Sequence, residues 1–307
     1  MLVIAAIGGN ALLRRGEPLT AETQRENVKN AALALAEIVR AGHSMIVTHG
    51  NGPQVGLLAL QGAAYKPKEA YPLDVLGAET EGMIGYLIEQ ELENALGHDH
   101  AVATLLTQVV VDPEDPAFQA PTKFVGPVYS RAEAEARANV AGWTIAQDGA
   151  HWRRVVPSPK PNEIPDLRVL RLLLDQGVTV ICAGGGGIPV MRRADGSMIG
   201  VEAVIDKDAA SCLLALDIGA DALLLLTDVD AVYENFGTDQ ATPIRKLTPE
   251  SGRALTLPDG SMGPKLQAAC DFAATGGFAG IGRLGDALRI LEGAAGTQVV
   301  QADGDRG

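Results

Sequence analysis

Short apolar runs, each followed by a loop rich in glycine or aspartate, recur along the chain and constrain its fold more than any other feature. The runs are residues 2–7, 45–48, 178–183 and 223–227. The stretches between these runs carry helical patterns. Apolar strands that alternate with helices predict a mostly parallel sheet covered by helices on both faces, which is the α/β class. Ligands of such sheets bind beyond the carboxyl ends of the strands, so we expect the loops to converge on one edge.

Helix signals separate these runs. Thr23 and Glu26 form a Thr-x-x-Glu capping signature, in which both side chains satisfy free N–H groups at a helix start. Apolar residues then recur at helical spacing over residues 28–39, and Gly42 suits the end of that helix. A further helix is predicted over residues 209–218.

The composition limits the class of protein. The 307 residues are 47% hydrophobic, which is ample for a large core, and they carry a formal net charge of −13. An acidic chain lacks the basic face of nucleic-acid binders, so no nucleic-acid partner is expected. The three cysteines are far apart, and neither a signal peptide nor a long apolar span is apparent. We therefore expect a cytoplasmic protein with no disulfide framework, no membrane partner and no metal site made by its own side chains.

Residues 113–165 differ from the rest of the chain. They hold eight of the 17 prolines and both tryptophans, Trp143 and Trp152. Asp148-Gly149 lies between two strand-like stretches, which indicates a hairpin. We interpret the segment as a small protruding subdomain or lid, inserted in a domain that spans residues 1–307, since structureless loops of this length are uncommon. A long connecting loop is the alternative.

The glycine loops are typical of anion sites. Glycine lets backbone N–H groups approach a ligand closely, and a helix N-terminus adds partial positive charge. One such loop is more often an ordinary turn, whereas three in one chain favour anion binding. The pattern of residues 50–56 also suits a dehydrogenase, but that motif needs an acidic residue at the end of the next strand. Asp74 follows Tyr-Pro-Leu instead, and no Gly-Lys-Ser/Thr of a Walker loop occurs. His49 is interpreted as a packed support for its loop, with a catalytic role as the alternative.

Two lysines stand at predicted helix starts. Lys207 and Asp208 come just before the helix over residues 209–218, where Asp208 could orient an ammonium group or cap the helix. Ser261 is a good N-cap, which places Lys265 in a first helical turn, where the helix dipole disfavours a cation. A bound phosphate would reverse that penalty, while a solvated surface lysine is the alternative.

Together these motifs resemble the carbamate kinases, members of the amino acid kinase superfamily. The resemblance is carried by residues 7–11 (IGGNA), 49–56 (HGNGPQVG), 106–112 (LTQVVVD), 121–123 (PTK), 152–161 (WRRVVPSPKP), 184–189 (GGGGIP), 200–208 (GVEAVIDKD), 226–230 (LTDVD) and 261–265 (SMGPK). It extends over residues 2–300, and the combination is far more specific than any single motif.

The resemblance implies a three-layer αβα sandwich around a mainly parallel sheet, with a small protruding subdomain, and a homodimer. It also implies a reversible reaction in which ATP and carbamate give ADP and carbamoyl phosphate with Mg²⁺. Such enzymes often make ATP from carbamoyl phosphate during the breakdown of arginine or other nitrogen compounds.

The same resemblance assigns roles to individual residues. It implies that Lys207 and Lys265 contact the nucleotide phosphates and the moving group, that Asp208 holds these lysines, and that Lys123 reaches the carbamoyl phosphate end. The expected phosphate and carbamate cradle is Gly8, Gly9, Asn10, Gly50, Asn51, Gly52, Gly185 and Gly186. The expected nucleotide pocket is Lys207, Asp228, Val229, Tyr233, Met262 and Lys265.

Two other functions remain open from the sequence. A kinase of the same superfamily could act on acetylglutamate or another small carboxylate, although residues 113–165 and the WRRVVPSPKP run favour carbamate. A nucleotide-binding regulator without turnover is the second, and the presence of Lys123, Lys207, Asp208 and Lys265 together argues against it.

Overall fold

An eight-stranded sheet forms the centre of the molecule. The computed structural model describes residues 1–12, 17–18, 20–65, 70–257 and 262–302. The strands of the sheet are β1 (Leu2–Ile7), β2 (Ser44–His49), β3 (Val102–Thr104), β9 (Thr179–Ile181), β12 (Ala222–Thr227), β15 (Lys246–Leu247), β16 (Phe278–Arg283) and β17 (Thr297–Val299). Their order is β15-β17-β16-β12-β1-β2-β9-β3, and every neighbouring pair is parallel except β16 and β17. The mainly parallel sheet is therefore confirmed.

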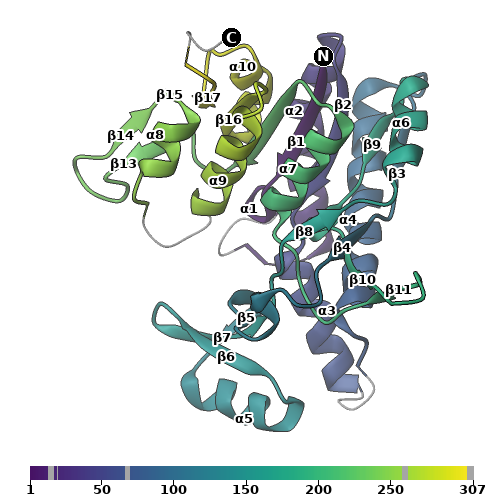
Figure 1. Ribbon diagram of the computed structural model, residues 1–307, viewed down its shortest axis with the longest axis vertical. Helices are drawn as coiled ribbons and strands as arrows, with labels where there is room; N and C mark the ends of the chain where they lie inside the picture. Colours follow the sequence, from purple (N-terminus) through teal and green to yellow (C-terminus); the bar gives the residue numbers. More distant parts are fainter. Residues whose placement is uncertain (13–16, 19, 66–69, 258–261, 303–307) are drawn as a thin grey trace.

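Helices cover both faces of this sheet, as expected for an αβα sandwich (Figure 1). One face packs against α2 (Ala21–Arg40), α4 (Leu73–Leu96) and α10 (Ala287–Leu291), and the other against α6 (Leu167–Asp175), α7 (Lys207–Ile218) and α9 (Met262–Ala273).

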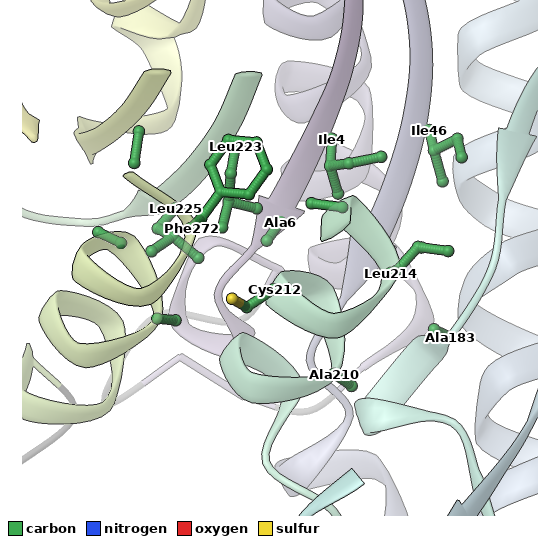
Figure 2. Packing of buried hydrophobic residues seen from close by; sticks show 14 of the residues in the cluster. Ile4, Ala6, Ile46, Ala183, Ala210, Cys212, Leu214, Leu223, Leu225 and Phe272 are labelled. Carbon is green, nitrogen blue, oxygen red and sulfur yellow. The ribbon is translucent and has the colours of Figure 1, made fainter. Parts of the chain in front are cut away.

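Successive side chains of a strand point to opposite faces, so the buried strands supply two separate cores. Figure 2 shows one of them, where Leu223 and Leu225 of β12 lie against Phe272 of α9, and Ala6 of β1 lies near Cys212 of α7. Cys212 and the other two cysteines, Cys182 and Cys270, are buried and unpaired.

Two helix starts differ from the sequence-based predictions. The first long helix begins at Ala21, because the hydroxyl of Thr20 accepts a hydrogen bond from the Thr23 N–H and makes Thr20 the N-cap. The predicted capping box at Thr23 is therefore wrong, since that residue lies within the helix. Helix α7 begins at Lys207 rather than residue 209, because the Asp206 carboxylate accepts from the N–H groups of Asp208 and Ala209.

A second sheet marks the points where the chain leaves and rejoins the sandwich. Its strands are β4 (Gln108–Val111), β8 (Pro161–Glu163), β10 (Ile188–Arg192) and β11 (Met198–Gly200), in the order β11-β10-β4-β8. Antiparallel pairing of Val110 with Glu163 and of Val111 with Pro161 holds the two ends of the intervening segment side by side.

That intervening segment forms a third, three-stranded sheet with one helix. It contains η1 (Pro116–Phe118), β5 (Lys123–Tyr129), α5 (Arg131–Ala141), β6 (Thr144–Asp148) and β7 (His151–Val156), with β7 between β5 and β6. The predicted hairpin at Asp148-Gly149 is confirmed, with Gly149 at φ +61°. Figure 1 shows this unit beside α3 (Gly52–Tyr65), at the opposite end of the molecule from both termini.

Short elements complete the described chain. They are α1 (Gly9–Leu12), η2 (Gly184–Gly186), β13 (Val232–Glu234), β14 (Thr242–Ile244), α8 (Pro249–Ala254) and η3 (Leu284–Asp286). Among the residues described, no helix is both long and apolar enough to span a membrane.

Candidate active site

Two of the glycine loops meet backbone to backbone at the carboxyl ends of β1 and β2. The Gly8 N–H donates to the Leu226 carbonyl, and the Gly50 N–H donates to the Ile7 carbonyl, each at 2.9 Å. A Cβ on Gly50 would lie only 2.7 Å from the Gly9 nitrogen. Glycine at residue 50 therefore permits an approach that no other residue allows. The helices α1 and α3 begin within these loops, at Gly9 and Gly52.

The third loop, after β9, packs against the second. Gly185, Gly186 and Gly187 all have positive φ, between +68° and +96°, which favours glycine at each position. A Cβ on Gly185 would overlap the Asn51 side-chain amide, and one on Gly186 would overlap the Ile205 carbonyl. The structure thus brings together the candidate substrate residues of the second and third loops.

A buried cluster of charge lies at the start of α7. The Asp208 carboxylate contacts the Lys207 ammonium through one oxygen and the Lys265 ammonium, at 3.1 Å, through the other. The exposed fractions of Lys207, Asp208 and Lys265 are 9%, 4% and 5%, so none is the solvated surface group considered above. Burial lowers the pKa of Lys207, although the Asp208 charge opposes this.

Lys123 joins the same region from the inserted segment. Its ammonium lies 2.6 Å from the Asp206 carboxylate, which also caps α7. Burial opposes ionisation of Asp206, but the charge and hydrogen bond of Lys123, the Ala209 N–H and the charge of Lys207 together outweigh it and lower the pKa of that carboxyl to about 2. The three lysines and two aspartates have a formal net charge of +1, and Lys207, Asp208 and Lys265 among them are buried. A net positive charge that is largely removed from water favours an anionic ligand.

The candidate nucleotide residues lie beyond β12 and at the start of α9. Asp228 is exposed and accepts a hydrogen bond from the Thr227 hydroxyl, and Val229 follows it. Tyr233, on β13, donates to Asp230 at 2.7 Å. Met262 is the first residue of α9 and packs on the core beneath.

Two of the predicted features lie partly outside the described residues. The predicted N-cap Ser261 is not among them. Asn10 lies in the short helix α1, but only its backbone is described. Lys265 nonetheless occupies the first turn of α9, as its spacing from Ser261 predicted.

Two buried ionisable side chains lie beneath the glycine loops. His49 is fully buried, with Nδ1 3.2 Å from the Gly50 carbonyl oxygen. Glu81 of α4 accepts hydrogen bonds from the N–H groups of Gly184, at 2.7 Å, and Thr107, at 3.2 Å. No pattern in the sequence marks Glu81, because an acidic residue within a helix is usually a solvated surface group.

One cavity of about 810 Å³ lies apart from these groups, between α3, the start of α4 and the inserted helix α5. It is lined by Tyr71, Trp143 and Arg154 among others, and by none of the lysines or glycine-loop residues described above. The chemistry of the side chains, rather than the size of a cavity, therefore locates the candidate active site.

Known proteins show the same combination of fold and sequence. The amino acid kinase family matches residues 1–279. Carbamate kinases from Rhizobium meliloti and Haemophilus influenzae are 57% and 53% identical, covering 99% and 98% of this chain and 95% and 97% of theirs. The solved structure of carbamate kinase from Giardia lamblia bound to AMP-PNP has a TM-score of 0.89 at 39% identity, with 98% of each chain covered. The similarity thus spans the whole fold.

Proposed function

The chain belongs to the amino acid kinase family and, within it, to the carbamate kinases, and we propose that its buried lysine–aspartate cluster carries out reversible phosphoryl transfer between ATP and carbamate. The observation that carries the proposal is the pair of buried lysines, Lys207 and Lys265, held on one carboxylate beside three glycine loops. The relatives' shared name favours carbamate over acetylglutamate as the acceptor.

The reaction requires the protein mainly to position the two substrates and to neutralise their charge. Carbamate is already an anion, so its oxygen needs no general base to attack the γ-phosphorus of ATP while the bond to the bridging oxygen of ADP breaks. In reverse, a β-phosphate oxygen of ADP takes the phosphoryl group and carbamate leaves. Catalysis then rests on aligning the two anions and neutralising charge on the phosphoryl group.

Each member of the cluster has a part in this scheme. Lys207 and Lys265 stabilise charge on the transferring group, and Asp208, which contacts both, fixes their ammonium groups without substrate. Lys123 approaches from the inserted segment and serves the carbamoyl phosphate end, so the segment acts as a lid. An incoming anion would compete with the Asp206 carboxylate for the Lys123 ammonium group.

The loops supply the remaining contacts. The loops that contain Gly8, Gly9, Asn10, Gly50, Asn51, Gly52, Gly185 and Gly186 cradle the phosphoryl group and carbamate. The N–H groups of Gly8, Gly50 and Gly186 are bonded within the fold, so these glycines serve by letting the loops approach each other and the ligand closely. Asp228, Val229, Tyr233 and Met262 line the pocket for the nucleotide, on the α9 side of the cluster.

A kinase that uses ATP is expected to need a divalent metal, and we propose Mg²⁺. Among the described residues, no group of three His, Cys, Asp or Glu side chains could hold a metal ion. Mg²⁺ commonly binds through substrate phosphates with few protein ligands, so the nucleotide phosphates would hold it here. When bound, it would neutralise phosphate charge.

We also propose that the enzyme makes ATP from carbamoyl phosphate in the cell, acts as a homodimer and is cytoplasmic. The family supports the first two, and three unpaired cysteines support a reducing compartment.

The test is ATP formation from ADP, Mg²⁺ and carbamoyl phosphate, with the Lys265→Met variant assayed in parallel. Loss of one preorganised cation should lower kcat about 10²- to 10³-fold. The fold should survive, because Asp208 keeps Lys207 as a partner. Lys29→Met, at an exposed position of α2, is the matched control and should retain full activity.

Wild-type protein that makes no ATP above the non-enzymatic rate would refute the function. A Lys265→Met variant with wild-type kcat would refute the phosphoryl role of this residue. Activity from a contaminating host enzyme would be equal in wild type, Lys265→Met and Lys29→Met. A loss confined to Lys265→Met therefore shows that the ATP is formed by this protein.

A further inference from the structure

Two consecutive polar residues of α4, Thr80 and Glu81, are almost completely buried beneath the glycine loops. Their exposed fractions are 0% and 1%. Burying a hydroxyl and a carboxyl is costly unless both are hydrogen-bonded. The Thr80 hydroxyl is hydrogen-bonded to the loop that contains Asn51, and the Glu81 carboxyl to the loop that contains Gly184. Neither residue is among those to which the proposed mechanism assigns a part.

Thr80 fixes the side chain of Asn51. Its hydroxyl donates to the carbonyl oxygens of Leu76, at 3.0 Å, and Gly77, at 2.9 Å, within its own helix. Because the single hydroxyl proton is used there, the Thr80 oxygen can only accept from Asn51, whose Nδ2 lies 2.8 Å away. The Asn51 amide is therefore held in one orientation at the start of α3.

Glu81 fixes the start of the four-glycine loop. One carboxyl oxygen accepts from the Gly184 N–H and the other from the Thr107 N–H. The Thr107 hydroxyl in turn accepts from the Ala183 N–H at 3.0 Å. Ala183 has φ +49°, a left-handed conformation that is unfavourable for alanine. These hydrogen bonds hold the loop in a backbone conformation that the sequence alone disfavours.

The two loops also contact each other directly. Gly185 has no side chain, and the Asn51 amide occupies the space that a Cβ would need. A shift of Asn51 would therefore reach Gly185, and a shift of the Gly184 backbone would reach Asn51. Thr80 and Glu81 are adjacent in sequence, so α4 ties both loops to a single rigid element.

We propose that Thr80 and Glu81 are positioning residues, which hold the Asn51 side chain and the Gly184–Gly186 turn in the relative placement that binds the carbamoyl group. This inference rests on the proposed function, in which these loops cradle the acceptor. In this role both residues act through the Asn51 side chain and the Gly184 backbone, to which they are hydrogen-bonded.

The kinetic test compares Thr80→Val and Glu81→Leu with the conservative variants Thr80→Ser and Glu81→Gln. The first pair removes the acceptor atoms and should raise the KM for carbamoyl phosphate about 10-fold or more, the scale of one lost hydrogen bond. The KM for ADP should change less than about 2-fold. Thr80→Ser and Glu81→Gln keep an acceptor for Asn51 and Gly184 and should restore most of the loss.

Thr179→Val is the matched control. Thr179 is equally buried, and its hydroxyl contacts His100 at 2.8 Å, at the opposite, amino-terminal end of β9. A general loss of core stability would affect Thr80→Val and Thr179→Val alike, whereas loss of positioning would raise the KM for carbamoyl phosphate only in Thr80→Val.

Amide hydrogen exchange tests the same inference without activity. Thr80→Val should speed exchange in residues 50–54, and Glu81→Leu in residues 183–187, with Thr179→Val changing neither. Unchanged exchange in both loops, or equal rises in the KM for ADP and carbamoyl phosphate, would overturn the positioning role. Wild-type protein without ATP formation would refute the proposed function instead, while the exchange data would still decide whether α4 holds the loops.

Discussion

His49 and Glu81, which lie near each other beneath the glycine loops, have opposite effects on the pH dependence of stability. Burial lowers the pKa of His49 to about 4, and the charge on Lys207 acts in the same direction. Burial raises the pKa of Glu81 to about 8, against the hydrogen bonds from Thr107 and Gly184. Both side chains therefore favour the neutral form in the folded protein at neutral pH.

The sign of each effect follows from proton counting. Between about pH 4.5 and 8, the folded state keeps a proton on Glu81 that the unfolded state has lost, so stability falls as pH rises. Between about pH 4 and 6.5, the unfolded state binds a proton at His49 that the folded state lacks, so stability rises with pH. The two contributions oppose each other up to about pH 6.5, and only that of Glu81 remains above it.

Glu81→Gln should remove the contribution of the carboxyl. The free energy of unfolding of this variant, relative to wild type, should increase with pH by up to about 1.4 kcal/mol per unit between about pH 4.5 and 8. Urea unfolding at several pH values within this range measures the difference. Glu79→Gln, at an exposed position of the same helix, controls for loss of one acidic group. A difference between Glu81→Gln and wild type that is constant across this range would contradict the prediction.

Among the secondary-structure elements, helix α7 connects the inserted segment to the lysine cluster. Its N-cap, Asp206, accepts from two backbone N–H groups of the helix and also contacts Lys123 of β5. Removing Lys123 leaves both capping hydrogen bonds in place. The start of α7, which positions Lys207 and Asp208, should therefore remain intact when the contact with β5 is lost.

Lys123→Met should affect the acceptor and spare the nucleotide. We expect a KM for carbamoyl phosphate raised by more than about 10-fold and a lower kcat, because a cation at the acceptor end and part of the lid contact are lost together. Steady-state kinetics with both substrates varied measures this, and calorimetry should show ADP binding unchanged. Lys160→Met, at an exposed position of the same segment, is the control. Equal weakening of ADP and carbamoyl phosphate binding would rule out the acceptor-side role.

Elements buried on both faces were predictable from the sequence. β1, β2 and β12 follow the apolar runs closely, because a strand in a covered parallel sheet must be apolar on both sides. The run over residues 178–183 forms a strand only over Thr179–Ile181, because the chain turns at Ala183 into the glycine loop. The antiparallel β17 could not be predicted, since its three residues carry no signal of direction.

The candidate site was predictable only where a local pattern marked it. Glycine loops and lysines at helix starts are visible in sequence because each lies beside its own strand or helix. The pairing of Lys123 with Asp206 joins residues 83 positions apart, and that of Glu81 with Gly184 joins residues 103 apart. Such contacts depend on the path of the whole chain, and no local spacing encodes them.

At the scale of the whole molecule, the inserted segment packs on α3, and two glycines make the closest backbone approach described between them. Gly56 of α3 faces Gly126 of β5, and a Cβ on Gly56 would overlap the Gly126 backbone. Gly126 has φ +73° and lies in an irregular part of the pairing between β5 and β7. Since neither glycine has a flexible side chain that could move aside, this contact helps to set the position of the segment, together with the packing of Val125 and Val156 against Val55. Figure 1 shows β5 beside α3.

Gly56→Ala should therefore displace the inserted segment while the sandwich stays folded. Both tryptophans, Trp143 and Trp152, lie in that segment, so fluorescence excited at a wavelength that only tryptophan absorbs reports on the segment. Far-ultraviolet circular dichroism follows mainly the helices of the sandwich. In Gly56→Ala, the fluorescence transition should move to a lower temperature than the circular dichroism transition, and the KM for carbamoyl phosphate should rise.

Gly62→Ala is the matched control on the same helix. A Cβ there would lie 3.7 Å from the Ala70 Cβ, an ordinary contact. Replacing glycine within a helix should then stabilise the protein by about 0.4–1 kcal/mol, because the unfolded chain loses freedom. Fluorescence and circular dichroism transitions should stay together in this variant. If they also stay together in Gly56→Ala, with the KM for carbamoyl phosphate unchanged, the glycine contact does not set the position of the segment.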